Sequence, residues 1–544
     1  MSDYKVKAPK KLIEVALPLK EINEACVREK SIRHGHPSTL HLYWARRPLA
    51  AARAVLFAQL VNDPGWDEEL QIGYKRKADA NRKREELFEI IRELVKWENT
   101  NNELVLEKAR AEIRKSWKVT CELNKDHPQA AELFNPDKLP AFHDPFAGGG
   151  SIPLEAQRLG LEAWASDLNP VAVLINKAMI EIPPKFVGHR PIGPIPQCDQ
   201  QKEITVSWPG VTGLAEDVRR WGHWVREEAY KRIGHLYPPI EITAEMVAER
   251  PDLAQYKGKK LTVIAYIWAR TVKSPNPLYS HVDVPLTSTY LLSDKKGKEA
   301  WIEPIIDGDN YEFKVRVGMP DDIETVKKGT KAAGRSSNFT CLLSNTPIDG
   351  KYIKTEGQAG RMGSKLMAIV AEGNSSRVYL SPDENQELLA KSEVPTWQPE
   401  QELVGKSADQ VPLYGMTTYG SLFSKRQMNS ICEFSNILMR FPQTEVIMNS
   451  TPGTQTPPDN ISLVDAIRVY LTFVLDKLTD YSSSLVTWIP MRETLRSSFG
   501  RQALAMVWDF AEVNPFSSSS GNWLSMVDWV CSALQVLPSR SFLI

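Results

Sequence analysis

The sequence predicts an α/β protein: a parallel, doubly wound sheet with a helical N-terminal region and a mixed, partly β insert. Three observations predict this fold class. Residues 141–167 follow the order strand, glycine loop, helix, strand, acid. Residues 49–61 are rich in Ala, Leu and Val, and residues 75–118 place apolar side chains at helical spacing. Residues 200–400 mix short strand-like runs with Pro, Gly and Asn turns.

The composition excludes several classes of protein. The 544 residues contain 67 Lys and Arg and 67 Asp and Glu, which argues against a wholly basic nucleic-acid binder. The six cysteines lie far apart without a C-x-x-C pair, which argues against a disulfide scaffold and against an intact Cys-pair zinc site. The N-terminus lacks an apolar signal region, and no run of 18 apolar residues occurs. We therefore expect a soluble, reduced, cytoplasmic protein.

The first 60 residues are basic although the whole chain is neutral. They hold 11 Lys and Arg against five Asp and Glu. Tyr43 and Trp44 stand beside Arg46 and Arg47 in this segment. The pattern is typical either of a solvated surface with a few packed aromatic side chains or of a surface that faces a phosphate or another ligand.

Two helical regions are expected before the glycine loop. The run from Leu49 to Val61 predicts a buried helix. Residues 75–118 carry two apolar stripes separated by a turn at Asn99–Asn102, which predicts a helical hairpin. Residues 61–120 hold 13 basic and 13 acidic residues, and this balance indicates a structural role.

The glycine loop lies between two predicted strands. The first strand ends near Asp144, and the second, at residues 162–166, ends at Asp167. Ser151 is expected to cap the intervening helix, with Pro153 in its first turn and Gly160 at its end. This order is typical of nucleotide-binding sheets, because glycines let the backbone approach the ligand and the second acid accepts hydrogen bonds from ribose hydroxyls.

The motif leaves the ligand open at this point. A dinucleotide site of the form G-x-G-x-x-G would need glycine where Pro153 stands, and no P-loop pattern occurs in the chain. A simple tight turn in an α/β domain is the alternative without a ligand.

The run Asp144-Pro-Phe-Ala-Gly-Gly-Gly150, taken with Asp167-Leu-Asn-Pro170, resembles the S-adenosylmethionine site of DNA amino-methyltransferases. The resemblance implies a Rossmann-like S-adenosylmethionine-dependent methyltransferase sheet, incomplete in this chain. It places Asp144 toward the methionine end of the cofactor, the glycines beneath it, and Asp167 at the ribose. The cofactor-binding residues implied are Asp144, Pro145, Phe146, Ala147, Gly148, Gly149, Gly150, Asp167, Leu168 and Asn169.

The N-terminal run Ser31–Pro48 extends the resemblance. Together with residues 144–170 it is similar to large bacterial and archaeal adenine-specific DNA methylases, which carry an N-terminal domain of unknown function and a zinc-ribbon-type insert. In such methylases this run lies next to the cofactor. Further similar stretches are residues 268–272 with 275–277, 357–363, and 499–502 through to 514–516. The resemblance adds to the cofactor-binding set Trp44, Arg46, Arg47 and Pro48.

The resemblance also implies five regions. They are a basic, cofactor-adjacent N-terminal family domain (1–62), a charged helical hairpin (63–135), an S-adenosylmethionine-binding α/β core (136–200), an inserted mixed α/β region with a degenerate zinc ribbon and a role in target recognition (201–410), and a helical segment leading to the missing catalytic half (411–544).

The insert departs from the family pattern. Relatives often have paired cysteines there, whereas the matching stretches Ser274–His281 and Cys341–Ser344 hold one histidine and one cysteine. These two residues cannot supply the four ligands of a structural zinc. We expect a metal-free remnant of the ribbon and no metal site.

A second departure concerns catalysis. Amino-methyltransferases act on a flipped base through a loop of the form Asp/Asn/Ser-Pro-Pro-Tyr/Phe, whose polar groups accept hydrogen bonds from the target amine. The Pro-Pro pairs at 183–184, 238–239 and 457–458 lack the required neighbours, and Asn514-Pro-Phe516 has one proline too few. The family order puts the loop after residue 544. We expect the sequence to stop before it, and the catalytic residues stay unassigned.

Three hypotheses remain open. The first is a DNA methyltransferase that uses S-adenosylmethionine on double-stranded DNA, at adenine N6 with cytosine N4 as the alternative, and that needs a second polypeptide carrying the catalytic loop. The second is a non-catalytic cofactor- and DNA-binding subunit or fragment of a modification or phage-defence system. The third is a methyltransferase for RNA or a smaller substrate, or a dinucleotide enzyme, although the absent third glycine weighs against the dinucleotide.

Overall fold

A computed structural model describes residues 5–66, 74–199, 207–332, 338–374, 376–441, 462–500 and 503–538. Its contacts divide the chain into two compact units. Unit 1 comprises Met1–Trp221, Pro442–Phe473 and Asp528–Ile544. Unit 2 comprises Gly222–Phe441 and Val474–Val527. Within the described residues, no helix is both long and apolar enough to cross a membrane.

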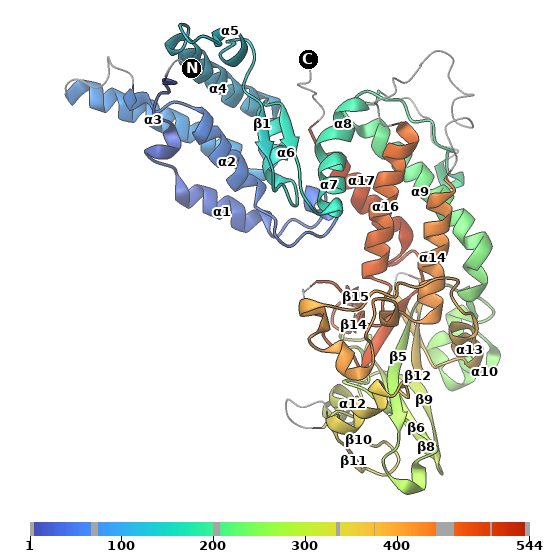
Figure 1. Ribbon diagram of the computed structural model, residues 1–544. Coiled ribbons are helices and arrows are strands. Elements are labelled where there is room, and N and C mark those ends of the chain that lie inside the picture. The colour runs from blue at the N-terminus through green and yellow to red at the C-terminus, as the bar shows by residue number, and fades with distance from the viewer. Residues whose placement is uncertain are drawn as a thin grey trace. The chain divides into compact units, whose positions relative to one another are not determined.

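Unit 1 is mostly helical (Figure 1). The predicted helix at 49–61 and the predicted hairpin at 75–118 are confirmed as α2 and as the pair α3 and α4. In chain order the elements are α1 (Leu19–Glu29), α2 (Leu49–Leu60), α3 (Tyr74–Leu94), α4 (Glu103–Leu123), α5 (Ala130–Leu133), β1 (Phe142–Asp144), α6 (Ser151–Arg158), β2 (Ala163–Ala165), α7 (Pro170–Asn176) and α8 (Ile182–Lys185). Three further helices contribute residues to both units: α9 (Thr212–Ile233), α16 (Leu463–Asp480) and α17 (Trp523–Leu534).

One apolar core joins the N-terminal helices to the glycine-loop helix α6. Phe57 of α2, Ile91 of α3, Ile113 of α4 and Leu159 at the end of α6 belong to the same buried cluster. Each of these side chains is at most 1% exposed. Because burial of apolar area is the main favourable term in folding, the N-terminal segment and the glycine loop depend on one core.

Buried charges fix the orientation of α6 within this core. Glu155 of α6 is fully buried and accepts hydrogen bonds from Arg53 of α2, with Nε–Oε2 at 2.5 Å. The guanidinium of Arg158 lies 3.2 Å from the same carboxylate. Burial lowers the pKa of Arg158 to about 10, against the opposing attraction of Glu155. A buried carboxylate with two arginine partners tolerates little displacement, so α2 and α6 are held in one relative position.

The predicted doubly wound sheet is present only in part. Strands β1 and β2 pair in parallel, with Phe142 opposite Ala163, His143 opposite Trp164 and Asp144 opposite Ala165. Within the described residues these two strands make up the whole sheet. The side chains of Phe142 and Ala163 pack on the core, whereas His143 and Trp164 are exposed.

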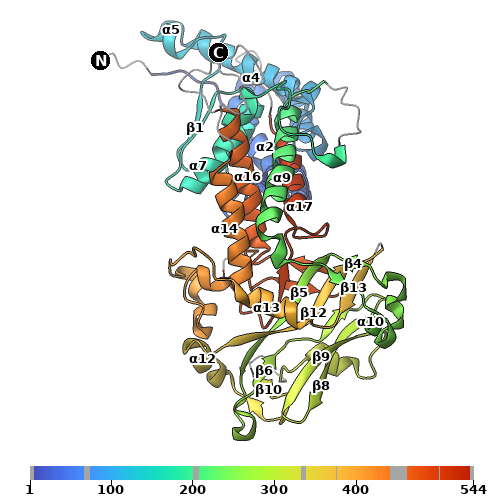
Figure 2. The same cartoon turned by 90° about the vertical axis from the view of Figure 1, so that its right-hand side faces the viewer.

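Unit 2 is built on an antiparallel sheet of order β13-β12-β5-β16, with β6 also paired to β5 (Figure 2). The mixed, partly β character predicted for residues 200–400 is confirmed. A second sheet, of order β7-β8-β9, shares a buried apolar cluster with it. The strands of the two sheets are β5 (Val263–Lys273), β6 (Asp283–Leu286), β7 (Leu291–Ser293), β8 (Ala300–Asp307), β9 (Asn310–Val317), β12 (Gly363–Glu372), β13 (Arg377–Leu380) and β16 (Asp509–Val513).

Short strand pairs and helices complete unit 2. The pairs are β3 (Ile240–Glu241) with β4 (Lys260–Leu261), β10 (Phe339–Thr340) with β11 (Pro347–Ile348), and β14 (Thr487–Ile489) with β15 (Thr494–Arg496). The helices are α10 (Ala244–Glu249), α11 (Ile323–Lys328), α12 (Gly350–Gln358), α13 (Glu384–Ser392) and α14 (Lys425–Met439).

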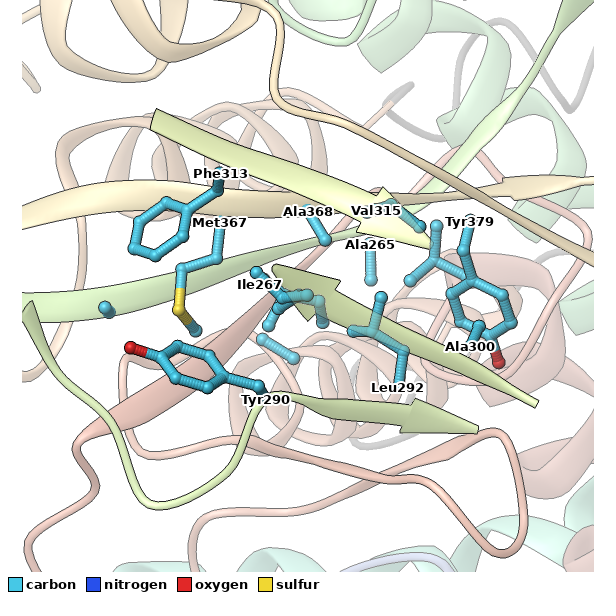
Figure 3. Packing of buried hydrophobic residues seen from close by; sticks show 14 of the residues in the cluster. Ala265, Ile267, Tyr290, Leu292, Ala300, Phe313, Val315, Met367, Ala368 and Tyr379 are labelled. Atoms are coloured by element: carbon cyan, nitrogen blue, oxygen red, sulfur yellow. The ribbon is translucent and has the colours of Figure 1, made fainter. Parts of the chain in front are cut away.

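The core of unit 2 lies between its two larger sheets. Figure 3 shows Ile267 of β5, Leu292 of β7, Phe313 of β9 and Met367 of β12 converging there. Each of these four side chains is at most 5% exposed. The segment 411–544, which was expected to be helical, also supplies β14, β15 and β16, and β16 pairs with β5 along the register Asp509–Ala269 to Val513–Ala265.

A buried ion pair ties α14 to β16. Arg426 donates two hydrogen bonds of 3.0 Å to the carboxylate of Glu512, and both side chains are at most 1% exposed. The Arg426 guanidinium also lies 3.9 Å from the centre of the Tyr266 ring. The pair is fully desolvated, so each charge depends on the other for compensation.

Candidate functional site

The glycine loop runs from the end of β1 to the start of α6 in a hydrogen-bonded arrangement. Ala147 N–H donates to Ser166 O at 3.0 Å, and Gly150 N–H donates to Ala147 O at 2.9 Å. Gly148 and Gly150 have φ values of +49° and +71°, in the left-handed region that favours glycine. The loop therefore turns sharply at the carboxyl end of the strand, where ligands bind in open α/β sheets.

Gly150 also makes a close approach that a larger residue could not. A Cβ at this position would lie 2.3 Å from Met179 Cε and 2.7 Å from Asn176 Oδ1. Asn176 is held in place, because its Nδ2 donates to Gly148 O at 3.1 Å and to Ala172 O at 2.8 Å. The side-chain amide of Asn176 thus stabilises the loop through its hydrogen bond to Gly148 O.

Gly150 takes the capping position predicted for Ser151. Gly150 is the N-cap of α6, and Ser151 is the first helical residue. The Ser151 hydroxyl is buried without a hydrogen-bond partner among the described residues. The expectation that Ser151 caps the helix is therefore wrong, because the left-handed conformation at Gly150 already directs the chain into the helix.

Asp167, which lies just after β2, forms a hydrogen bond with the glycine loop. Its Oδ2 accepts a hydrogen bond from Gly148 N–H at 2.8 Å, and its Oδ1 accepts one from Asn169 N–H at 2.8 Å. These hydrogen bonds from the backbone of Asn169 and Gly148 lower the pKa of Asp167. The carboxylate is therefore ionised at neutral pH, and each oxygen keeps acceptor capacity for a ligand hydroxyl.

Side chains from the N-terminal segment cover the loop. A Cβ at Gly148 would lie 3.0 Å from Tyr43 Cε1, and one at Gly149 would lie 3.4 Å from the Tyr43 ring and 3.5 Å from Arg46 Cγ. Together these groups enclose a pocket of about 340 Å³. Its lining is Tyr43, Ala45, Arg46, Arg47, Asp144, Phe146, Ala147, Gly148, Gly149, Gly150, Ser151, Ile152 and Asp167.

A buried histidine–glutamate pair holds the N-terminal segment in position. Glu29 accepts hydrogen bonds from the N–H groups of Leu49 and Ala50, at the start of α2, at 2.9 and 3.0 Å. His36 Nδ1 accepts from Ser38 N–H, so Nε2 carries the proton and donates to Glu29 at 2.9 Å. Burial alone would raise the pKa of Glu29, but the hydrogen bonds from His36 and the two amides outweigh it and lower the pKa.

Arg46 brings a positive charge to the pocket in a partly desolvated setting. Burial lowers the pKa of Arg46, and the charge of Glu29 opposes this shift. An arginine remains protonated under these conditions and offers a planar set of donors for a carboxylate or phosphate.

The predicted cofactor residues divide into two groups in the structure. Nine of them line the pocket: Arg46, Arg47, Asp144, Phe146, Ala147, Gly148, Gly149, Gly150 and Asp167. The other five lie outside the lining: Trp44, Pro48, Pro145, Leu168 and Asn169.

Two of these five residues shape the chain beside the pocket. Pro48 is the N-cap residue of α2. The Asn169 side chain accepts a hydrogen bond from Val171 N–H at the start of α7. Trp44 and Leu168 are 52% and 98% exposed.

Tyr43 lines the pocket but was not among the predicted site residues. Its position beside Trp44 in the basic N-terminal segment could have indicated it.

The Asn514-Pro-Phe516 motif begins with a buried, hydrogen-bonded asparagine. Asn514 is 1% exposed, and its Nδ2 donates to Val263 O at 2.8 Å while its Oδ1 accepts from Phe516 N–H at 2.9 Å. Both amide atoms are thus used in fixing the end of β16. Pro183 and Pro184 lie within α8, and the pair at 457–458 lies outside the described residues.

The two stretches that were expected to be the remnant of a zinc ribbon meet in unit 2. Ser274 Oγ lies 3.3 Å from Cys341 Sγ, and Cys341 is fully buried. Among the described residues, no group of three or more His, Cys, Asp and Glu side chains is arranged to hold a metal ion.

Comparison with known proteins gives two family matches. Residues 16–90 match the family described as Protein of unknown function (DUF1156), and residues 128–191 match the family described as D12 class N6 adenine-specific DNA methyltransferase. The second match spans β1, the glycine loop, α6 and β2, and it supports a DNA methyltransferase of the adenine N6 class. No curated protein and no solved structure matches the chain.

Proposed function

We propose that the chain binds S-adenosylmethionine over its glycine loop and takes part in adenine N6 methylation of double-stranded DNA. The observation that carries this proposal is the pocket of about 340 Å³ at the carboxyl ends of β1 and β2, bounded by Asp144, the three glycines and Asp167. The D12-class match over the same residues supports it, because enzymes of that class use this cofactor.

The residues present suit each part of the cofactor. The ionised Asp167 carboxylate accepts hydrogen bonds from the two ribose hydroxyls, and Arg46 pairs with the methionine carboxylate. Phe146, which is 82% exposed, offers apolar surface to the uncharged part of the ligand. A side chain at Gly148 or Gly149 would contact Tyr43 or Arg46 and reduce the volume of the pocket, which glycine avoids.

We further propose that a second polypeptide segment supplies the amine-activating Pro-Pro loop, which none of the 544 residues provides. The two-stranded parallel sheet that the described residues form supports this part. Parallel sheets occur almost only with both faces covered and with more strands than two. Here His143 and Trp164 leave one face of the β1–β2 pair exposed, Trp164 by 57%. Additional strands beside this pair would complete the sheet and bring a loop to its carboxyl edge.

When bound, S-adenosylmethionine supplies an electrophilic methyl group on a sulfonium. This chain's own residues bind and orient it: Asp167 fixes the ribose, and Tyr43 covers the glycine loop. The target amine needs hydrogen-bond acceptors to become nucleophilic, and these belong to the separate loop.

Two measurements test the proposal. In equilibrium dialysis, S-adenosylmethionine and S-adenosylhomocysteine should compete for one site that NAD does not occupy, whereas tighter binding of NAD would favour a dinucleotide enzyme. In a labelled-methyl transfer assay on duplex DNA, the purified chain should give little or no product, and a polypeptide carrying an Asp-Pro-Pro-Tyr loop should restore it. Robust turnover by the chain alone would contradict the need for a separate loop.

A non-catalytic cofactor- and DNA-binding subunit is the second candidate. The buried state of Asn514 and the missing Pro-Pro loop favour it over a self-sufficient enzyme. In the same transfer assay this alternative predicts no product with any added loop-bearing polypeptide, although the cofactor still binds.

A further inference from the structure

Unit 2 contains a pocket of about 350 Å³ whose walls carry four positive side chains. Lys295 and Lys298 come from the turn between β7 and β8, and Arg377 begins β13. Arg492 comes from the turn between β14 and β15. These four cations come from three separate segments of the chain, so the packing of unit 2 and not a single local charge run brings them to one cavity.

One of these cations is built into a buried network. Lys295 Nζ lies 2.5 Å from Glu493 Oε2, and the Glu493 side chain is 9% exposed. Glu493 Oε1 also accepts hydrogen bonds from the hydroxyls of Tyr379 and Ser293, at 3.0 and 3.2 Å. The backbone of Glu493 has φ +50°, a strained conformation for a residue with a side chain. Strain of this kind is concentrated at binding and catalytic sites.

The other three cations have no such compensation. Lys298, Arg377 and Arg492 form no ion pair with any residue in the described part of the chain. The remaining acid of the pocket, Glu372, accepts a hydrogen bond from Ser518 N–H at 2.6 Å. Three unpaired positive charges thus face one carboxylate, and the pocket as a whole favours an anion.

A second pocket lies beside the first. An adjoining pocket of about 500 Å³ shares Lys298, Ser376 and Arg377 with the first. A ligand that occupied both pockets would therefore meet Lys298 and Arg377 in each. A polyanion with repeated charges suits this arrangement better than a single small anion, because Lys and Arg bind successive phosphates along a nucleic-acid strand.

We propose that this basic pocket, defined by Lys295, Lys298, Arg377 and Arg492, binds the phosphodiester backbone of duplex DNA. The inference rests on the proposed function, which makes DNA the substrate, and it goes beyond it by assigning the residues of unit 2 that contact the backbone. Contacts of this type position the DNA without reading its sequence. A free nucleotide presents the same phosphate chemistry, and the experiment separates the two sources.

The test is fluorescence anisotropy of a labelled duplex with the full chain at several salt concentrations. Lys298→Gln should weaken binding several-fold and lower the slope of log K against log salt by about 0.9, the value for one lost phosphate contact. Arg377→Gln combined with Arg492→Gln should lower the slope by about twice that. The matched control is Lys296→Gln, which removes an exposed lysine of the same turn that does not line the pocket.

Several outcomes overturn the proposal. Equal salt slopes for Lys298→Gln and Lys296→Gln would do so, as would an absence of DNA binding by the parent chain. Calorimetry with ADP tests whether the pocket binds a free nucleotide instead. If the double variant loses affinity for ADP while its affinity for the duplex equals that of the parent, the pocket binds a free nucleotide and the proposal is wrong. S-adenosylmethionine affinity, measured on the same preparations, reports separately on the proposed function and should not change in any of these variants.

Discussion

The support of the glycine loop by α7 and by the π-helical residues Lys177–Glu181 after it can be tested by replacing Gly150 with alanine. The left-handed conformation of Gly150 (φ +71°) costs a residue with a side chain about 1–2 kcal/mol. The new Cβ would also lie 2.3 Å from Met179 Cε and 2.7 Å from Asn176 Oδ1. Overpacking of this kind costs about 1–3 kcal/mol. We therefore expect Gly150→Ala to lower the free energy of unfolding by about 2–5 kcal/mol in total.

The matched control is Gly188→Ala, in the same unit. Gly188 has the same φ of +71°, but a Cβ added there would meet no atom within 4 Å beyond its chain neighbours. Urea unfolding of both variants isolates the steric part as a difference of about 1–3 kcal/mol. S-adenosylmethionine affinity should fall for Gly150→Ala, because displacement of Asn176 breaks its hydrogen bond to Gly148 O. Equal stability and equal cofactor affinity in the two variants would refute the reasoning.

Three further perturbations have distinct expected outcomes. Tyr43→Ala should uncover the glycine loop and weaken S-adenosylmethionine binding about tenfold in calorimetry, an effect of about 1.4 kcal/mol. Tyr43→Phe keeps the ring and should keep the affinity. A large loss of affinity in the Phe variant would contradict the covering role of the ring. Arg426→Met should lower the free energy of unfolding by about 3–5 kcal/mol, because it leaves the Glu512 carboxylate buried without its cation. Adding Glu512→Gln should recover part of this loss. If it does not, the loss does not come from breaking the ion pair. Burial lowers the pKa of Lys477 to about 8, against the opposing charges of its acidic neighbours. Between about pH 8 and 10.4 the unfolded chain therefore binds more protons than the folded chain, so the free energy of unfolding should rise with pH in this range. Lys477→Met should flatten this part of the pH profile of stability.

The glycine loop could be predicted from the sequence because its chemistry is local. Gly148, Gly150 and Asp167 lie within 20 residues of one another, and the hydrogen bond from Gly148 N–H to Asp167 joins the ends of two adjacent strands. The pattern strand, glycines, helix, strand and acid needs no distant partner to be recognised.

The remainder of the site depends on contacts that sequence periodicity does not carry. Tyr43 lies more than 100 residues before the glycines that it covers, and its position follows from the shared core of α2 and α6 and from the Glu29–His36 pair. Similarly, β16 is a five-residue strand in a segment expected to be helical. Its conformation is decided by pairing with β5, and tertiary pairing overrides local propensity in such short runs.

The central claim is that Asp167 and the glycine loop bind S-adenosylmethionine, and calorimetry with this cofactor tests it most directly. The parent chain and Asp137→Ala, which removes an exposed acid of the same unit, should bind one equivalent with the same affinity. Asp167→Ala should bind much more weakly, because the ribose loses its acceptor and Gly148 N–H loses its partner. Equal affinity for Asp167→Ala and the parent chain would contradict the assignment of the site.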